Sequence, residues 1–140
     1  MERRDIIKDQ IEQLGKVLAL MLANFLGWKS KGLIDQGIET SNKQLKSELD
    51  IDIEELLSNT KDELEEYFSG RKMTGEHLEL LADYLYEVGE SKIDFDKRFA
   101  ENHFIKSIDL LEFADEVANT VSLDRLNKKT KIENMLQHFV

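Results

Sequence analysis

The chain contains neither cysteine nor proline among its 140 residues. Without cysteine it has no disulfide, no thiolate metal site and no thiol nucleophile. Proline breaks helices and marks loops, so its absence favours a chain that is nearly all helix with short connections. The sequence therefore predicts an all-α fold, and the missing cysteine agrees with a reducing, cytoplasmic compartment.

Long apolar runs are also missing from the sequence. The longest, residues 17–28, has 12 residues, whereas a membrane-spanning helix needs roughly 20. The preceding residues 5–16 carry charges of both signs and already follow a helical pattern. We therefore predict a cytoplasmic protein in which this run is a buried helix, with no membrane span and no targeting segment.

Positive charge is in short supply: 19 basic residues face 29 acidic ones, for a net charge of −10. Such a surface repels phosphate backbones, so nucleic acid is not an expected partner. One basic stretch departs from this balance, and it consists of Arg125, Lys128, Lys129 and Lys131. It is either a solvated helix face or a patch that binds an acidic partner.

Apolar residues make up 41% of the chain, and they recur at helical spacing. A first helix is predicted over residues 4–26, with Gly27 as its end and its second half as the most buried part of the fold. The length suits one domain, residues 1–140. The seam of the first helix consists of Ile7, Ile11, Leu14, Leu18, Met21 and Phe25.

The whole chain is predicted to form about six helices, or seven if residues 53–69 are divided into two, arranged as antiparallel hairpins. A capping-box pattern at Thr60 and Glu63 indicates a break near residues 58–59, although one uninterrupted helix is the alternative. Thr74 is a candidate N-cap, and Gly89 is expected to close the helix that follows. The remaining helices are expected at residues 33–49, 53–57, 61–69, 75–88, 95–119 and 122–139.

One part of the chain resembles a tetratricopeptide repeat (TPR), in which two antiparallel helices pack through small and large side chains. The residues that match its first helix are Leu78, Leu81, Ala82, Tyr84, Leu85 and Gly89. Those that match its second helix are Ser107, Leu111 and Ala114. The two halves are separated by about 13 more residues than a repeat has, and only one repeat is visible. The resemblance implies a TPR-like helical hairpin.

Most of the chain also resembles an uncharacterised family of small bacterial helical proteins. The similarity lies in residues 4–7 and 11–15, in Leu56-Leu57-Ser58, and in the segment 80–83, Leu-Leu-Ala-Asp. It implies a bacterial cytosolic protein with a repeat-like helical fold and no assigned activity. The family supplies no catalytic residue to carry over to this chain.

Residues suited to catalysis or metal binding are not grouped in the sequence. His77, His103 and His138 lie on three different predicted helices, where we expect surface or edge histidines and no metal ligands. No serine lies in a glycine-flanked turn, and no glycine-rich phosphate loop is present. We therefore predict no catalytic, cofactor-binding or metal-binding residues. An acidic stretch, either solvated or a docking surface for a basic partner, comprises Glu54, Glu55, Asp62, Glu63, Glu65 and Glu66.

Aromatic residues offer the remaining candidates for contacts. Tyr86 is expected to be exposed, and exposed aromatics favour interfaces. Trp28 is expected at the edge of the core. Phe95, Phe99 and Phe104 are predicted to be core residues, with a groove or a subunit contact as the alternative.

The prediction that best fits these observations is a non-enzymatic protein–protein interaction module, which binds a peptide or a helix on stacked hairpins. Its candidate partner-binding residues are the basic stretch, Arg125, Lys128, Lys129 and Lys131, together with Tyr86. One alternative is a small ligand-binding or enzymatic bundle with its site between helices. Another is a homodimer formed through the apolar second half of the first helix.

Overall fold

The computed structural model describes residues 3–139, with side chains from residue 9 onward. This range is helical and has no strand, so the predicted all-α class is confirmed. The helices are α1 (Arg3–Ser30), α2 (Ile34–Leu49), α3 (Ile53–Ser58), α4 (Lys61–Phe68), α5 (Gly75–Lys92), α6 (Lys97–Ala118), α7 (Leu123–Leu136) and a 3₁₀ turn, η1 (Gln137–Phe139). The predicted break at residues 58–59 is therefore present.

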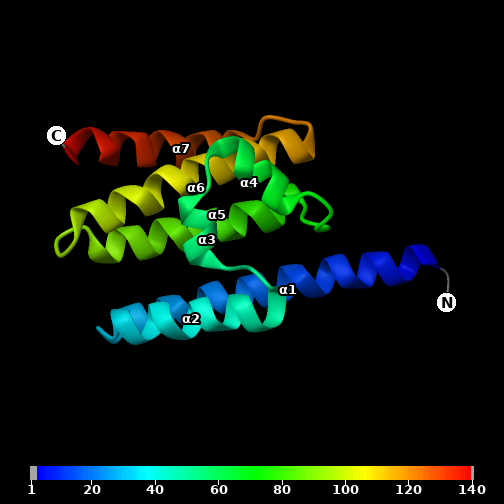
Figure 1. Ribbon diagram of the computed structural model, residues 1–140, viewed down its shortest axis with the longest axis horizontal. Helices are drawn as coiled ribbons and strands as arrows, with labels where there is room; N and C mark the ends of the chain where they lie inside the picture. The colour runs from blue at the N-terminus through cyan, green and yellow to red at the C-terminus, as the bar shows by residue number, and fades with distance from the viewer. Residues whose placement is uncertain (1–2, 140) are drawn as a thin grey trace.

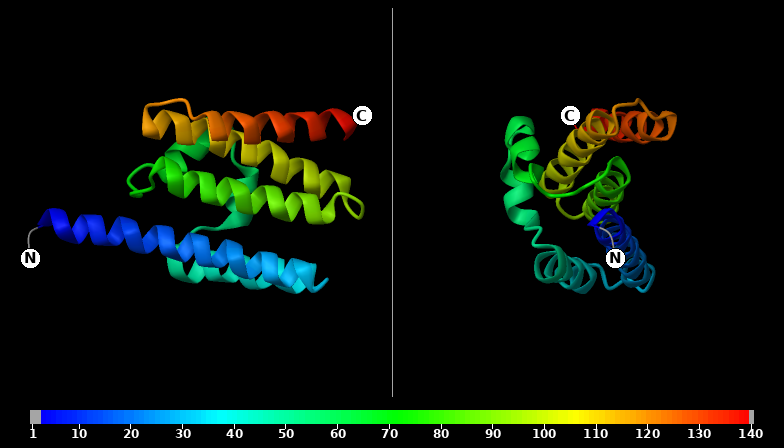
Figure 2. Two further views of the ribbon diagram at one scale, coloured as in Figure 1. Left: turned by 180° about the vertical axis from the view of Figure 1, so that it is seen from behind. Right: turned by 90° about the vertical axis from the view of Figure 1, so that its right-hand side faces the viewer.

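The long helices form a curved row in the order α2, α1, α5, α6 and α7 (Figure 1). Neighbours in this row pack side by side, and the closest association is the antiparallel hairpin of α5 and α6. The short helices α3 and α4 lie next to α6, to the left of the row in the end-on view of Figure 2. The N-terminal end of α1 projects beyond the other helices. None of the helices within residues 3–139 has the length and apolar character needed to cross a membrane.

Helix α5 is the most buried element of the fold, because it packs against α1 on one side and α6 on the other. Its fully buried side chains include Leu81, Tyr84 and Leu85. The prediction that the second half of α1 would be the most buried part is therefore wrong. The predicted seam itself is confirmed at Leu18, Met21 and Phe25, whereas the side chain of Ile7 lies outside the described residues. Beside the seam, Leu20 is 57% exposed.

Two glycines expected to end helices lie inside them. Helix α1 continues past Gly27 to Ser30, and the chain turns only at Gly32, whose φ of 75° is left-handed. Helix α5 continues past Gly89 to Lys92. A Cβ atom at Gly89 would lie 2.9 Å from Cε1 of Phe104, so this glycine lets α5 and α6 approach closely. Gly89 therefore serves a contact between two helices, and the local sequence around it does not reveal this contact.

Side chains cap the helices much as the sequence indicates. Thr60 and Glu63 form the predicted capping box, and Asp52 caps α3. Helix α6 begins at Lys97 behind its cap, Asp96, and not at Phe95. Phe95 is consequently 79% exposed, so its assignment to the core is wrong. The core assignment is confirmed for Phe104, which is fully buried.

Candidate functional site

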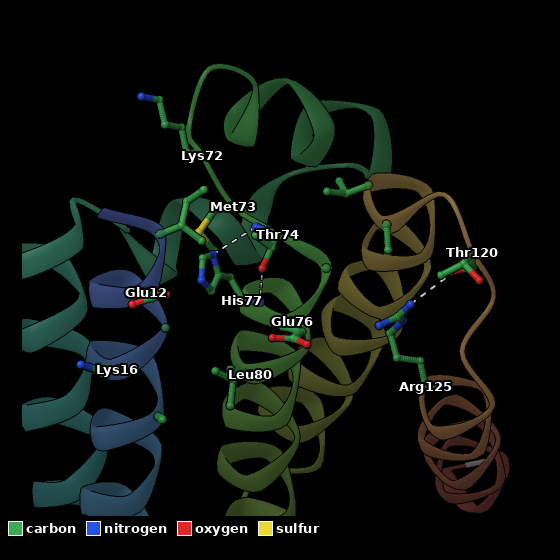
Figure 3. Close-up of a pocket in the computed structure, with 16 residues that line it drawn as sticks. Glu12, Lys16, Lys72, Met73, Thr74, Glu76, His77, Leu80, Thr120 and Arg125 are labelled. Carbon is green, nitrogen blue, oxygen red and sulfur yellow. Dashed lines mark hydrogen bonds between the residues drawn. The ribbon is translucent and has the colours of Figure 1, made fainter. Parts of the chain in front are cut away.

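The largest cleft lies at the end of the molecule where α1 extends past α5, and it has a volume of about 1080 Å³. Its walls are α1, the start of α5 and the turn between α6 and α7 (Figure 3). The small residues Gly15, Ala19 and Gly75 are part of its lining, and Ile11 and Leu80 give it apolar surface. This end of the molecule therefore offers room for bulky side chains of another molecule.

A second, narrower cleft of about 260 Å³ lies farther along α5. On each of three helices, the residues of the two clefts include a series at spacings of three and four, which lies as a stripe along one face of the helix. These stripes are Ile11, Gly15, Ala19, Leu22 and Leu26 on α1, Glu76, Leu80, Asp83 and Glu87 on α5, and Arg125, Lys128 and Ile132 on α7. We call the combined surface the α5 groove. Along α1 it runs from Ile11 to Leu26, 16 residues that extend over about 22 Å of helix.

His77 stands in the wide end of the groove, where it joins the start of α5 to α1. Its Nδ1 accepts a hydrogen bond from the backbone N–H of Thr74 at 3.1 Å, and the Thr74 hydroxyl accepts from the backbone N–H of His77 at 3.2 Å (Figure 3). Burial lowers the pKa of His77, opposed in part by backbone groups of Ile11 and Lys72. The neutral ring thus replaces glutamate in a capping box.

The α7 wall begins with Arg125, the first of the basic residues predicted to bind a partner. Its side chain is buried. Nε lies 2.5 Å from a carboxylate oxygen of Asp115, and Nη1 lies 3.3 Å from one of Glu79. The hydrogen bond to Asp115 raises the pKa of Arg125 most strongly. This guanidinium ties α7 to both α5 and α6 of its own chain.

Lys128 continues the wall one turn later. Its Nζ lies 2.6 Å from Glu79 and 3.0 Å from Asp83, two carboxylates of α5. Burial opposes the charge of Lys128, but the hydrogen bonds to Glu79 and Asp83 outweigh it and raise its pKa. Burial also raises the pKa of Asp83 above its usual range. The Lys128–Asp83 ion pair is therefore partly desolvated, and each residue stabilises the charged form of the other.

The remaining predicted residues also have partners within the chain. Lys129 lies 3.7 Å from Glu112 of α6. Lys131 is exposed, and its Nζ lies 5.0 Å from the ring centroid of Tyr86, within cation–π range. Tyr86 is half-buried, less exposed than expected. The structure thus places Arg125, Lys128 and Lys131 with Tyr86 along the groove, and Lys129 on the side of α7 that faces α6. Most of these residues face carboxylates that the sequence analysis did not associate with them.

Two histidines expected at the surface or at an edge are buried. His77 is 4% exposed and His103 is 2% exposed. Burial lowers the pKa of His103, whose Nδ1 lies 2.8 Å from the carbonyl oxygen of Phe99. Within the described residues, no group of three or more histidine or carboxylate side chains is arranged to hold a metal ion.

Other buried polar side chains are used in packing. The Tyr84 hydroxyl donates to Asn42 Oδ1 at 2.6 Å, which connects α5 to α2, and the Ser107 hydroxyl donates to the carbonyl of Ala82 at 2.8 Å. Among the described side chains, every buried nitrogen and oxygen atom has a partner. The chemistry of the core is therefore structural, and the exposed surface of the groove is the feature that can bind another molecule.

Sequence reasoning did not identify the α1 and α5 residues of the groove. Ala19 and Leu26 are not part of the seam predicted for the first helix, and Ala19 is exposed and Leu26 is 40% exposed. Val117, in the opposite wall of the wide cleft, is 42% exposed. The available signal was the widening of the α1 stripe, which has more apolar positions than one neighbouring helix covers. Comparison of the chain with known proteins found no family model, curated protein or solved structure that matches it.

Proposed function

We propose that the protein is a non-enzymatic interaction module that binds a helical segment of another protein in the α5 groove. The observation that carries this proposal is that two clefts, one farther along than the other, are lined by the same three helices, α1, α5 and α7. About 22 Å of groove accommodates about four turns of helix. Grooves of this kind bind amphipathic helices through anchors at spacings of three, four and seven residues.

Exposed apolar surface supports this proposal. Leu26 and Val117 keep about two-fifths of their surface exposed along the groove, although a soluble chain gains free energy by burying such side chains. Contiguous apolar surface rimmed by polar groups is typical of protein interaction sites. The α1 stripe supplies most of the apolar surface, and polar groups come from Glu12 and Lys16 beside it and from the carboxylates of the α5 stripe.

A TPR-like origin is consistent with this function. The α5–α6 hairpin uses residues that the repeat pattern singles out, since Gly89 faces Phe104 and Ser107 bonds to Ala82. We propose on this basis, and on the resemblance to small bacterial helical proteins, a cytoplasmic module built around one such hairpin. Its groove would present a peptide-binding surface comparable to that of stacked hairpins.

A ligand-binding bundle is the second candidate, and the volume of the wide cleft favours it. A cleft of about 1080 Å³ is large enough for a small molecule. However, its one histidine, His77, uses Nδ1 to cap α5, which leaves less of the ring available for chemistry. Helix binding uses both clefts of the groove, whereas a small ligand would use the wide cleft alone.

Selection of helical peptides from a displayed library tests the proposal. Ala19 lines the groove, whereas Gln13 is exposed on the same helix and does not line it. We expect selected peptides to bind the unaltered chain and Gln13→Arg equally, and to bind Ala19→Arg about tenfold more weakly. Both variants add the same charge to an exposed position of α1. A difference in peptide affinity between them is therefore due to where on the helix the charge lies.

Failure to select any peptide, or equal binding to both variants, would contradict the proposal. Self-association through α1 predicts a different result, in which sedimentation at high micromolar concentration gives a dimer that Leu20→Lys dissociates. Leu20 is 57% exposed and lies outside the groove lining. A monomer under these conditions eliminates the homodimer.

A further inference from the structure

Helix α7 differs from α5 and α6 in how it is held. Its only buried residues are Arg125 and Ile132, whereas α5 and α6 bury eight or more each. Leu123 and Leu126 at its start are 70% and 46% exposed. The first half of α7 is therefore attached mainly by charge, and apolar packing is concentrated in its second half.

The surface beneath α7 is acidic. Glu79 and Asp83 of α5 and Glu112 and Asp115 of α6 all form ion pairs with α7, and these four carboxylates define what we call the acidic platform. The platform is continuous with the α5 groove, because Asp83 lines the groove as well. In the end-on view of Figure 2, α7 lies at one end of the curved row, where only one side of it is covered.

Helix α7 is itself a basic amphipathic helix. Residues 122–136 carry four basic and two acidic side chains in a chain whose net charge is −10. We propose that the acidic platform is a docking site for a basic amphipathic helix of a partner protein, and that α7 occupies this site when the partner is absent. The inference goes beyond the proposed function, because the platform lies beneath α7 and is a second site, whereas the α5 groove has α7 as one of its walls.

The contacts made by α7 show how such a helix binds. One basic residue reaches both α5 and α6, as Arg125 does, and a second, one turn later, bridges two carboxylates, as Lys128 does. An apolar residue one turn farther enters the core, as Ile132 does. The Lys128 side chain keeps 38% of its surface exposed, so water and salt reach these pairs and an incoming basic helix competes for the same carboxylates.

A labelled synthetic peptide with the sequence of residues 122–139 is the probe for this site. In the unaltered chain, tethered α7 competes at an effective concentration in the millimolar range, so the peptide binds weakly. Ile132→Asp places a charge in the core and releases α7 from the same chain. We expect the full-length Ile132→Asp chain to bind the peptide about tenfold more tightly than the unaltered chain.

Two matched acidic variants locate the binding site. Combined with Ile132→Asp, Glu79→Gln removes a platform carboxylate, and we expect it to weaken peptide binding about tenfold. Glu101→Gln removes an exposed carboxylate of α6 that lies outside both the platform and the groove, and it should leave binding unchanged. Equal weakening by both variants, or by neither, would overturn the proposal.

Hydrogen exchange on the unaltered chain provides a test that does not depend on any variant folding. We expect the amides of α7 to exchange about 100-fold faster than those of α5, and raising NaCl from about 50 to about 500 mM to increase this difference. Exchange of α7 and α5 at the same rate at both salt concentrations would overturn the proposal. A dimer of the Ile132→Asp chain in place of a one-to-one peptide complex would identify a second copy as the occupant and would also overturn it.

These outcomes separate the inference from the proposed function. If library peptides bind the groove but the peptide of residues 122–139 does not bind the Ile132→Asp chain, the proposed function stands and the inference fails. If neither binds, the proposed function fails as well.

Discussion

The α5–α6 hairpin and helix α7 are attached to the fold by different forces. In the hairpin, Gly89 accommodates the Phe104 ring, and Leu81, Leu85 and Leu111 are fully buried. Helix α7 instead places Arg125 and its neighbouring lysines against carboxylates. Apolar packing holds the hairpin and is not weakened by charge screening, whereas the part-exposed ion pairs of Lys128 and Lys129 are weakened when salt screens them. The comparison predicts that substitutions and solution conditions affect the two regions differently.

The largest expected effect on stability comes from removing the ring of Phe104, which packs between α5 and α6. Phe104→Ala deletes a fully buried aromatic side chain and should lower the free energy of unfolding by about 4 kcal/mol. Urea denaturation measures this change. Phe95→Ala is the control, because Phe95 is 79% exposed, and it should change stability by less than about 0.5 kcal/mol. Similar losses in both variants would mean that the hairpin is not closely packed.

A pair of glycine substitutions examines the close approach of the two helices. Both Gly27 and Gly89 lie inside helices, where alanine is favoured by about 1 kcal/mol. At Gly27 no atom lies within 4 Å of the added Cβ, so Gly27→Ala should raise the melting temperature. At Gly89 the Cβ lies 2.9 Å from Phe104, so Gly89→Ala should lower stability by about 1–2 kcal/mol. A gain in both variants would show that α6 moves away without cost.

Acid should weaken the hairpin and its junction with α1. The fold lowers the pKa of His77 and His103, so their contribution is complete above the unfolded value near 6.5 and declines as the pH falls below it. The slope is at most about 1.4 kcal/mol per pH unit for each histidine. Chemical denaturation between pH 7.5 and about 5 should therefore show a smaller decline for His77→Gln than for the unaltered chain. An identical decline would show that the fold does not require a neutral His77; His138→Gln, at an exposed position, is the control.

The smallest effect is expected in α7. Lys128→Glu places three carboxylates together, and we expect a loss of about 1 kcal/mol after allowance for solvent screening. The lysine beside it, Lys129, lies 3.7 Å from a single carboxylate, so Lys129→Glu should cost less. Melting temperatures at low and high salt measure both, and the deficit of Lys128→Glu should shrink as salt rises. A deficit that is independent of salt would mean that packing holds this half of α7.

Sequence reasoning succeeded where the deciding interactions are local. The helical seam of α1, the capping box at Thr60 and Glu63 and the break at residues 58–59 all depend on residues within one or two turns of each other. It failed where a distant partner decided the outcome. The sequence around Gly89 predicts a helix end, but in the structure this glycine lies inside α5 and makes room for Phe104. His77 was predicted at the surface or at an edge, but it is buried next to α1.

The candidate site depended almost entirely on distant partners. The basic stretch was found from the sequence as a cluster of charge, but the carboxylates that face it lie elsewhere in the chain, 46 residues away between Arg125 and Glu79. Likewise, the α5 groove draws its stripes from three helices that are far apart in sequence. No local pattern specifies which face of one helix meets which face of another.

The sequence by itself determined that this chain is helical and approximately where its helices begin, because apolar spacing and caps act within a few residues. The tertiary structure alone decided that α5 is the central helix, that α1 and α7 flank an open groove, and that the basic residues of α7 are paired within the chain. The physical reason is that burial and ion pairing depend on which surfaces meet in space, and residues close in sequence do not specify this.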